Sequence, residues 1–350
     1  VPGLAPERIL FTPNFAPRYE YEEALRLGVN VTVDGLFPLE AWPQVFAGAP
    51  IVLRLDPGSG RGHHRHVRTG GAKAKFGISV HQLDRACAAV EAAGARVIGL
   101  HAHAGSGIRD PENWGRVGRF LLAQATRFPH VKFVDLGGGL GVPYRPDEER
   151  LDLQALKQVI EALRGQRPDL QFWIEPGRFL VANAGVLLAE VTQIKAKGEV
   201  NYAGLMTGMN SLLRPALYGS HHEIHNLSKL DEKPSSVVQV VGPICETGDF
   251  LGHDRELALA ADLHGADLGG GLGQQGQASP DDVAAHEIGV GRQRAKDHVL
   301  ALFGDPAQLI ELPDIQDRRG LDGADLDEQD VVPKDRELTE QEWLNAARDL

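Results

Sequence analysis

The sequence predicts an α/β protein, with a parallel sheet or a (β/α) barrel in the first half of the chain and a mostly β domain after it. Two observations support this fold class. Short apolar runs alternate with helical patterns, which is typical of parallel strands joined by crossover helices. After about residue 184 the apolar runs become β-branched, and no long helical pattern separates them. In such folds the polar chemistry gathers at the carboxyl ends of the strands.

Six apolar runs are the predicted strands of the first half. They are RILFTP (8–13), VNVTVD (29–34), IVLRLD (51–56), VIGLHAHAG (97–105), VKFVDLGGG (131–139) and QFWIEPGR (171–178). Histidine, glycine and charged residues stand at the ends of the last three runs, where a site is expected.

Helical patterns fill the intervals between these runs. Ser79 and Gln82 have the spacing of a capping box, which predicts a helix through Ala93 that Gly94 closes. Leucine and isoleucine recur at helical spacing in 153–163, which predicts a second helix.

The chain divides into three parts by pattern. Residues 1–184 form the predicted barrel domain, and residues 185–255 begin a β domain with strands at GVLLAEVTQIK (185–195) and SSVVQVVGPI (235–244). Residues 256–350 form a tail rich in Ala, Gly, Asp and Gln, with no element assigned except a last helix capped by Thr339 and Glu342.

The motif DLGGGLG occurs twice, at 135–141 and 267–273. The first copy follows an apolar strand, so its backbone amides are placed to meet an anion. The second follows no strand pattern. We interpret the first as a phosphate loop and the second as a linker.

Composition excludes several classes of protein. The 350 residues are 42% hydrophobic, which suffices for a large core, and the net charge of −12 argues against a general nucleic-acid or membrane-surface binder. No segment approaches the roughly 18 apolar residues of a membrane span, and no signal peptide pattern opens the sequence.

The only cysteines in the sequence are Cys87 and Cys245, and so few fit a reducing cytoplasm. Cys87 lies in an Ala-rich helical run and is predicted to pack, whereas Cys245 lies in a loop beside a glutamate.

Small and cationic residues at successive strand ends predict a phosphate site. The candidates are Ser106, Gly137, Gly138, Gly139, Gly177 and Arg178. Each alone is equally explained by a tight turn, but three such turns at neighbouring strand ends favour an anion at the mouth of the sheet.

Glu175 ends an apolar strand and therefore needs a partner. One candidate is Arg178, three residues later. The other is a protonated ring nitrogen of a bound cofactor, which the carboxylate would keep charged as an electron sink. His101 and His103 are two apart on one strand and should face the same side, as zinc ligands or with one imidazole packed on a flat ring.

Two further histidine clusters are HHRH (63–66) and HHEIH (221–225). His221 and His225 are four apart and would share a helix face, so metal binding is one interpretation. Their spacing matches no well-defined zinc motif, which favours solvated loop histidines.

Together these motifs resemble the fold-type III pyridoxal-phosphate decarboxylases, and within them the diaminopimelate decarboxylase branch. The matching segments are KFGIS (75–79), HAHAGSGI (101–108), DLGGGLGVPY (135–144), IEPGR (174–178), GMNSLLRPALYGSHHEI (208–224) and GPICETGD (242–249). The resemblance runs from about residue 8 to about residue 255. The RPALY and GPICE segments separate this branch from alanine racemases and from eukaryotic-type ornithine decarboxylases.

The resemblance implies a (β/α)8 TIM-type barrel, of which six of the eight strands are found, followed by a mostly β domain, usually in a homodimer with shared active sites. It implies the cofactor pyridoxal 5′-phosphate. His103 would stack on the pyridine ring, and Glu175 would face the ring nitrogen. Ser106, the glycine run 137–139, Gly177 and Arg178 would hold the phosphate.

The resemblance also implies the reaction, which is decarboxylation of meso-diaminopimelate to L-lysine, the last step of lysine biosynthesis. Arg178, Arg214 and Tyr218 would bind a substrate carboxylate, and Glu246 would bind the ammonium group. Cys245 would protonate the carbon that loses CO2. The alternative interpretations are a packed turn at RPALY and a small buried residue at Cys245.

Two departures from the family pattern stand out. A YAxKAN-type motif with the Schiff-base lysine is absent from this sequence, and no tyrosine follows Tyr218. We therefore expect very low activity from this chain alone. The rival hypotheses are a decarboxylase for a basic amino acid or carboxynorspermidine, a non-catalytic homologue that acts through its dimer surface, and a metal hydrolase built on the histidine clusters.

Overall fold

The computed structural model describes residues 3–58, 61–62, 74–259 and 299–303, and the statements below concern these residues. They divide into two compact units. Unit 1 takes the described residues up to 142 together with 149–180, and unit 2 takes 143–148 and the described residues from 181 onward. The HHRH cluster, the second DLGGGLG motif and the predicted helix at Thr339 lie outside the described residues.

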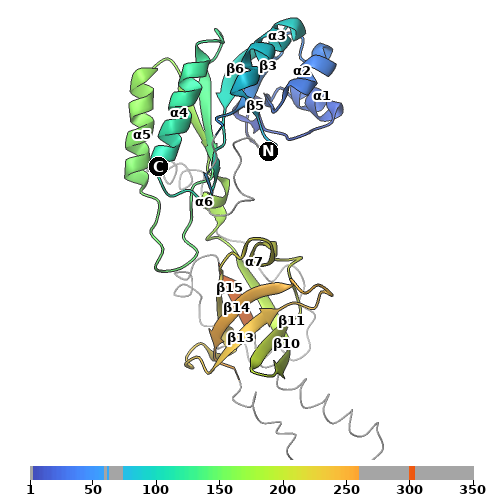
Figure 1. The fold of residues 1–350 in the computed structure, drawn as a ribbon, viewed down its shortest axis with the longest axis vertical. Coiled ribbons are helices and arrows are strands. Elements are labelled where there is room, and N and C mark those ends of the chain that lie inside the picture. The colour runs from blue at the N-terminus through green and yellow to red at the C-terminus, as the bar shows by residue number, and fades with distance from the viewer. Residues whose placement is uncertain (1–2, 59–60, 63–73, 260–298, 304–350) are drawn as a thin grey trace, which may run out of the picture. The chain divides into compact units, whose positions relative to one another are not determined.

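Unit 1 contains a half-barrel of six parallel strands in chain order, with one short strand added beside it (Figure 1). The six are β1 (Leu10–Phe11), β2 (Asn30–Val33), β3 (Pro50–Asp56), β6 (Arg96–His101), β8 (Phe133–Gly138) and β9 (Gln171–Glu175), each parallel to the next. β5 (Ile78–Ser79) pairs with β3, and β4 (Arg61–Gly62) pairs with β7 (Gly105–Ser106). The six predicted strands and their parallel arrangement are confirmed.

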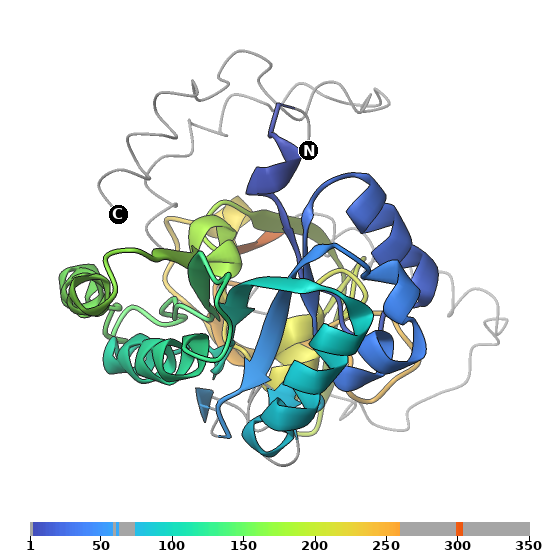
Figure 2. The ribbon, with the colours of Figure 1, turned by 90° about the horizontal axis from the view of Figure 1, so that it is seen from above.

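The helices of unit 1 stand in an arc around this sheet (Figure 2). They are α1 (Arg18–Arg26), α2 (Leu36–Ala41), α3 (Leu83–Ala93), α4 (Glu112–Ala125), α5 (Leu153–Gln166) and the short α6 (Gly177–Val181), with 3-10 turns at Pro6–Arg8, Pro43–Val45 and Val80–Gln82. Their apolar faces and the strands bury one core that includes Trp114, Leu121 and Leu163. Burial of this apolar surface is what holds the helices on the sheet.

The structure confirms some of the predicted helix ends and contradicts one. Gly94 ends α3 in the left-handed conformation at φ 65°, as predicted. The predicted capping box is wrong, because the Ser79 side chain accepts from the His81 N–H and a 3-10 turn precedes the helix, which starts at Leu83. The predicted helix in 153–163 is confirmed as α5, and Asp152 caps it by accepting from the Ala155 N–H at 2.9 Å.

Unit 2 is a six-stranded, mostly antiparallel sheet in the order β12-β15-β10-β11-β13-β14. The strands are β10 (Val186–Lys197), β11 (Val200–Leu205), β12 (Glu223–Asn226), β13 (Ser236–Val241), β14 (Phe250–Leu257) and β15 (Val299–Phe303), with the short helix α7 (Leu213–Tyr218) and a 3-10 turn at Leu227–Lys229. The mostly β character is confirmed. β15 lies in the segment to which the sequence assigned no strand, and it pairs with both β10 and β12.

Within the part of the chain that the structure describes, no helix has the length and apolarity required to cross a membrane.

Candidate functional site

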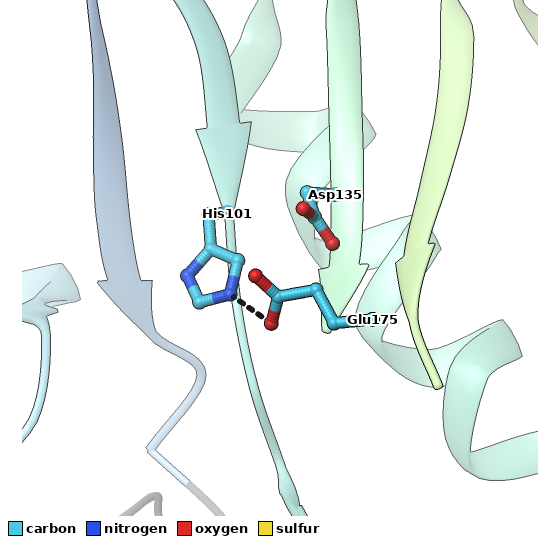
Figure 3. A group of neighbouring side chains, drawn as sticks. All are labelled: His101, Asp135 and Glu175. Atoms are coloured by element: carbon cyan, nitrogen blue, oxygen red, sulfur yellow. Dashed lines mark hydrogen bonds and ion pairs between the residues drawn. The ribbon is translucent and has the colours of Figure 1, made fainter. Parts of the chain in front are cut away.

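Three neighbouring strands of unit 1 bring His101, Asp135 and Glu175 together at their carboxyl ends (Figure 3). His101 and Asp135 are register partners on β6 and β8, and Glu175 ends β9. His101 Nε2 and Glu175 Oε2 are 3.2 Å apart, and one ligand atom from each of the three residues lies within 4.8 Å of the others. The alternating side chains of parallel strands explain why residues distant in sequence share this face.

The partner of Glu175 is therefore His101. The candidate Arg178 instead donates from Nη2 to Ser106 Oγ at 2.6 Å. The sequence singled out both His101 and Glu175 but did not pair them. It missed Asp135, although that residue also ends an apolar run, which is the signal that pointed to Glu175.

Burial and nearby charges shift the pKa values of the two carboxyl groups of this cluster, Glu175 and Asp135, in opposite directions. Burial alone would raise the pKa of Glu175, but the hydrogen bond from His101 and the nearby charges of His101, His103 and Arg54 hold it below its usual range. Burial raises the pKa of Asp135 to about 6, opposed by His101 and by the Gly137 N–H, which donates to Asp135 Oδ1 at 2.9 Å. Glu175 is thus the more acidic of the two groups and is ionised near neutral pH, and Asp135 loses its proton at higher pH than Glu175.

His103 follows β6 and is held in one tautomer. Its Nδ1 accepts a hydrogen bond from the Gly138 N–H at 3.0 Å, so the ring proton resides on Nε2. Burial, with the charges of His101 and Arg54, lowers the pKa of His103 to about 4. His103 is therefore a neutral, oriented imidazole beside Glu175 near neutral pH.

The glycine run is required by packing between neighbouring strand ends. A Cβ on Gly138 would overlap the Glu175 carbonyl oxygen, and one on Gly139 would overlap the carbonyl oxygen of Gly105. Gly137 and Gly139 also have φ values of 69° and 84°, in the left-handed region that favours glycine. The N–H groups of Gly137 and Gly138 are used within the cluster, by Asp135 and His103.

Ser106 and Arg178 form a second polar group beside this run. A Cβ on Gly139 would lie 3.3 Å from Ser106 Cα, so the Ser106–Arg178 pair adjoins Gly139. A Cβ on Gly177 would meet no atom within 4 Å. Packing among the described residues thus does not explain the glycine at 177, whereas close approach by a ligand would.

A buried ion pair, Asp34 with Arg54, lies at the ends of β2 and β3. Arg54 Nη1 is 3.1 Å from Asp34 Oδ1, and the two side chains are 6% and 8% exposed. Arg54 also donates to Asn14 Oδ1 at 3.3 Å and stacks over the ring of Phe76. Sequence reasoning missed this pair. The signal was an arginine inside the apolar run IVLRLD, because a buried charge requires a partner.

In unit 2, Arg214 is enclosed by hydroxyl and aromatic groups. Its Nη2 donates to Tyr144 Oη at 2.7 Å and to Ser220 Oγ at 3.1 Å. Its guanidinium lies 5.4 Å from the ring centroids of both Tyr144 and Tyr218. Arg214 Nε is buried and has no hydrogen-bond partner among the described residues, so one donor of this arginine is not used by the described protein groups.

Cys245 and Glu246 are exposed in the loop between β13 and β14. The Gly248 N–H donates to Glu246 Oε1 at 3.1 Å, which shapes the turn. Cys87 packs half-buried against the core of unit 1, as predicted. The two cysteines thus differ in accessibility.

The helix-face interpretation of His221 and His225 is wrong. His225 lies in strand β12, and His221 precedes it. His221 Nδ1 accepts from Arg255 Nη1 at 2.6 Å, and its Nε2 is 2.9 Å from Glu223 Oε1. With only 12% of its side chain exposed, His221 is a packed part of unit 2 rather than a solvated loop residue.

The chain matches known proteins over most of its length. The family model described as "Pyridoxal-dependent decarboxylase, pyridoxal binding domain" matches residues 2–182. The chain is 37% identical over 269 residues to diaminopimelate decarboxylase of Methanothermobacter thermautotrophicus, covering 73% of this chain and 62% of that protein. It is 33% identical over 260 residues to diaminopimelate decarboxylase of Escherichia coli K12, covering 71% of this chain and 62% of that protein.

Solved structures of diaminopimelate decarboxylases are also similar to this chain. A crystal structure of diaminopimelate decarboxylase matches with a TM-score of 0.69 and 28% identity, covering 86% of this chain and 68% of that one. The Helicobacter pylori diaminopimelate decarboxylase complexed with L-lysine matches with a TM-score of 0.64 and 26% identity, covering 86% and 69%. This chain therefore spans less than two thirds of the length of these curated relatives.

Proposed function

This chain belongs to the pyridoxal-dependent decarboxylases, and from that membership we propose that it binds pyridoxal phosphate and serves the decarboxylation of meso-diaminopimelate to L-lysine. The observation that carries the proposal is the ionised carboxylate of Glu175, held by His101 beside the neutral ring of His103. The names of the relatives supply the substrate, and one related structure contains L-lysine.

The residues of unit 1 fit the cofactor. An ionised glutamate suits a protonated ring nitrogen, and a neutral imidazole suits packing on a flat ring. Ser106 and Arg178 supply a hydroxyl and a cation for a phosphate, and the open space at Gly177 leaves room for one. The N–H groups of Gly137 and Gly138 donate to Asp135 and His103 instead of to the phosphate.

When bound, pyridoxal phosphate supplies the sink for the electrons left on carbon as CO2 departs. The chain's own residues have defined tasks around it. Glu175 would hold a proton at the ring nitrogen, and His101 keeps that carboxylate ionised and oriented. The neutral imidazole of His103 would pack on the cofactor ring. Ser106, Gly139, Gly177 and Arg178 would bind the phosphate.

Residues of unit 2 recognise the far end of the substrate in this proposal. Diaminopimelate carries a carboxylate and an ammonium group at each end, so the unreacted end needs a cation and an anion. Arg214, whose guanidinium lies beside the ring of Tyr218, binds the carboxylate together with that tyrosine. Glu246 binds the ammonium group, and the exposed thiol of Cys245 donates the proton to carbon.

The proposal extends to assembly and location. We expect a homodimer in which each subunit contributes to the partner's site, and a cytoplasmic protein, consistent with its two free cysteines.

Equilibrium dialysis with pyridoxal phosphate tests the cofactor site. The chain should bind the cofactor, and Glu175→Gln should weaken binding about tenfold, since an amide cannot hold the ring proton. Glu161→Gln, on the exposed face of α5, is the matched control and should bind like wild type. Absence of binding by the wild-type chain would overturn the proposal.

Borohydride reduction and a product assay test the reaction. Reduction with pyridoxal phosphate should leave no stoichiometric lysine adduct, because the chain has no YAxKAN-type motif. Lysine formation from meso-diaminopimelate should then be very low with this chain alone. One stoichiometric adduct, on Lys75 for example, would instead identify a replacement lysine, and full turnover would refute the expected impairment.

A second candidate is a non-catalytic homologue that acts by pairing with an active relative. Retained cofactor binding with no turnover, together with co-purification of an intact relative, would support it over the first. A substrate panel separates diaminopimelate from basic amino acids and carboxynorspermidine, and Arg214→Gln should affect only substrates with a second carboxylate.

A further inference from the structure

Asp249 is a buried carboxylate that no sequence interpretation assigned a role. It directly precedes β14, and only 3% of the residue is exposed. No salt bridge to it is found in the described part of the chain, so backbone N–H groups must satisfy its charge. Carboxylates held in this way form strong, charge-assisted hydrogen bonds.

The two oxygens of Asp249 bind two different loops. Oδ1 accepts from the Met209 N–H at 2.6 Å, and Oδ2 accepts from the Ile244 N–H at 2.8 Å. The first loop connects β11 to α7, which carries Arg214 and Tyr218. The second loop carries Cys245 and Glu246. One side chain thus joins the two segments of unit 2 to which substrate chemistry is assigned.

Two glycines make room for this carboxylate. A Cβ on Gly208 would lie 2.5 Å from both carboxylate oxygens, and a Cβ on Gly242 would overlap Oδ2 and Gly208 Cα. Backbone bonds close the arrangement, because the Gly242 N–H donates to the Asp249 carbonyl and the Asp249 N–H donates to the Glu246 carbonyl, both at 3.0 Å. The loops are therefore packed directly around the acid.

We infer that Asp249 is a positioning residue, which fixes the loop of Cys245 and Glu246 against the loop that leads to Arg214 and Tyr218 through its Met209 and Ile244 hydrogen bonds. The inference rests on the proposed function for the roles of those four residues. The linkage of the two loops does not, since it follows from the contacts of Asp249 alone.

Hydrogen exchange of backbone amides, followed by mass spectrometry, tests the linkage. Asp249→Asn keeps the size of the side chain but replaces one acceptor oxygen with a donor, so one of the two N–H groups loses its partner. At least one of the peptides covering 206–212 and 242–248 should exchange about tenfold faster or more, while β10 and β11 keep their wild-type rates. Unchanged exchange in both loops would overturn the inference, and so would an equal increase throughout the sheet.

Asn226→Ala is the matched control. Asn226 is also buried in unit 2 and also ties backbone groups, donating to the Ala258 carbonyl at 2.6 Å and accepting from the Ser228 N–H at 3.1 Å. It contacts neither of the two loops in these bonds. Its loss should leave exchange in 206–212 and 242–248 at the wild-type rate.

Adding meso-diaminopimelate separates the inference from the proposed function. In wild type the compound should slow exchange in both loops, and in Asp249→Asn this protection should be lost. If meso-diaminopimelate does not slow exchange in the wild-type loops, the proposed substrate site is wrong. The linkage of the two loops is tested separately, by comparing wild type with Asp249→Asn in the absence of the compound. Full protection in Asp249→Asn would overturn the positioning role even if the loops exchange faster.

Discussion

At the scale of single residues, the pairing of Glu175 with His101 sets the charge of the site. Burial favours the protonated carboxyl, and the hydrogen bond from His101 reverses that preference. His101→Phe keeps a flat ring but removes the donor, so the pKa of Glu175 should rise. A carbon-13 NMR titration of the Glu175 carboxyl measures this directly. His130→Asn, an exposed histidine, should leave the titration unchanged, and an unshifted curve in His101→Phe would show that His101 does not control the carboxylate.

Two glycines give opposite predictions for the same substitution. Gly138→Ala places a methyl group on the Glu175 carbonyl oxygen, so the strand ends must separate, and unfolding should become easier by about 2 kcal/mol or more. Gly165→Ala, inside α5 with no atom within 4 Å of its Cβ, should stabilise by about 0.5–1 kcal/mol. Urea unfolding of both variants measures the difference. Equal effects at the two positions would refute the packing argument for the glycine run.

At the scale of elements, α5 depends on its amino-terminal cap. The Asp152 carboxylate accepts the Ala155 N–H and lies where the helix dipole favours negative charge. Asp152→Ala should cost about 1 kcal/mol of stability, measured by urea unfolding, whereas Asp152→Asn, which keeps the acceptor, should cost less. If Asn and Ala destabilise equally, the hydrogen bond is not the source of the effect.

The sequence predicted elements well where a local pattern and the tertiary fold agree. Apolar runs that end on polar residues located all six strands of the half-barrel, and Gly94 located the end of α3. The HHEIH cluster misled because a spacing of four residues was interpreted as helical, whereas pairing with β15 makes the segment a strand. β15 itself was missed because its role depends on two distant partners and not on its own pattern.

The same limit applies to the candidate site. Residue type and position at strand ends were enough to select His101, His103 and Glu175. Which residues would pair could not be read from spacing, since Arg178 is near Glu175 in sequence but His101 is near it in space. Asp249 was missed for a related reason, because its partners are 5 and 40 residues away along the chain.

At the scale of the whole molecule, the site residues affect the pH dependence of folding. His103 has a pKa of about 4 in the folded state, below the 6.5 of an unperturbed histidine, so the unfolded chain binds more protons between these values. Its contribution to stability therefore rises with pH across that window. Asp135 has a pKa of about 6, above the usual 3.8, so the folded state binds more protons, and its contribution falls as pH rises from about 4 to 6.

The two contributions oppose each other in wild type, and single variants should expose them. Asp135→Asn removes the falling contribution, so stability should rise more steeply with pH than in wild type, by up to about 1.4 kcal/mol per pH unit between pH 4 and 6. His103→Asn removes the rising contribution and should change the slope by a similar amount in the opposite direction. Urea unfolding at half-unit pH steps, followed by tryptophan fluorescence, measures these slopes, since three of the chain's four tryptophans, Trp42, Trp114 and Trp173, lie in the described part of unit 1. The double variant should return to a slope near that of wild type. Slope changes of the same sign in both single variants would mean that these residues do not carry opposite pKa shifts, and the assignment of a neutral His103 beside an ionised Glu175 would lose its electrostatic basis.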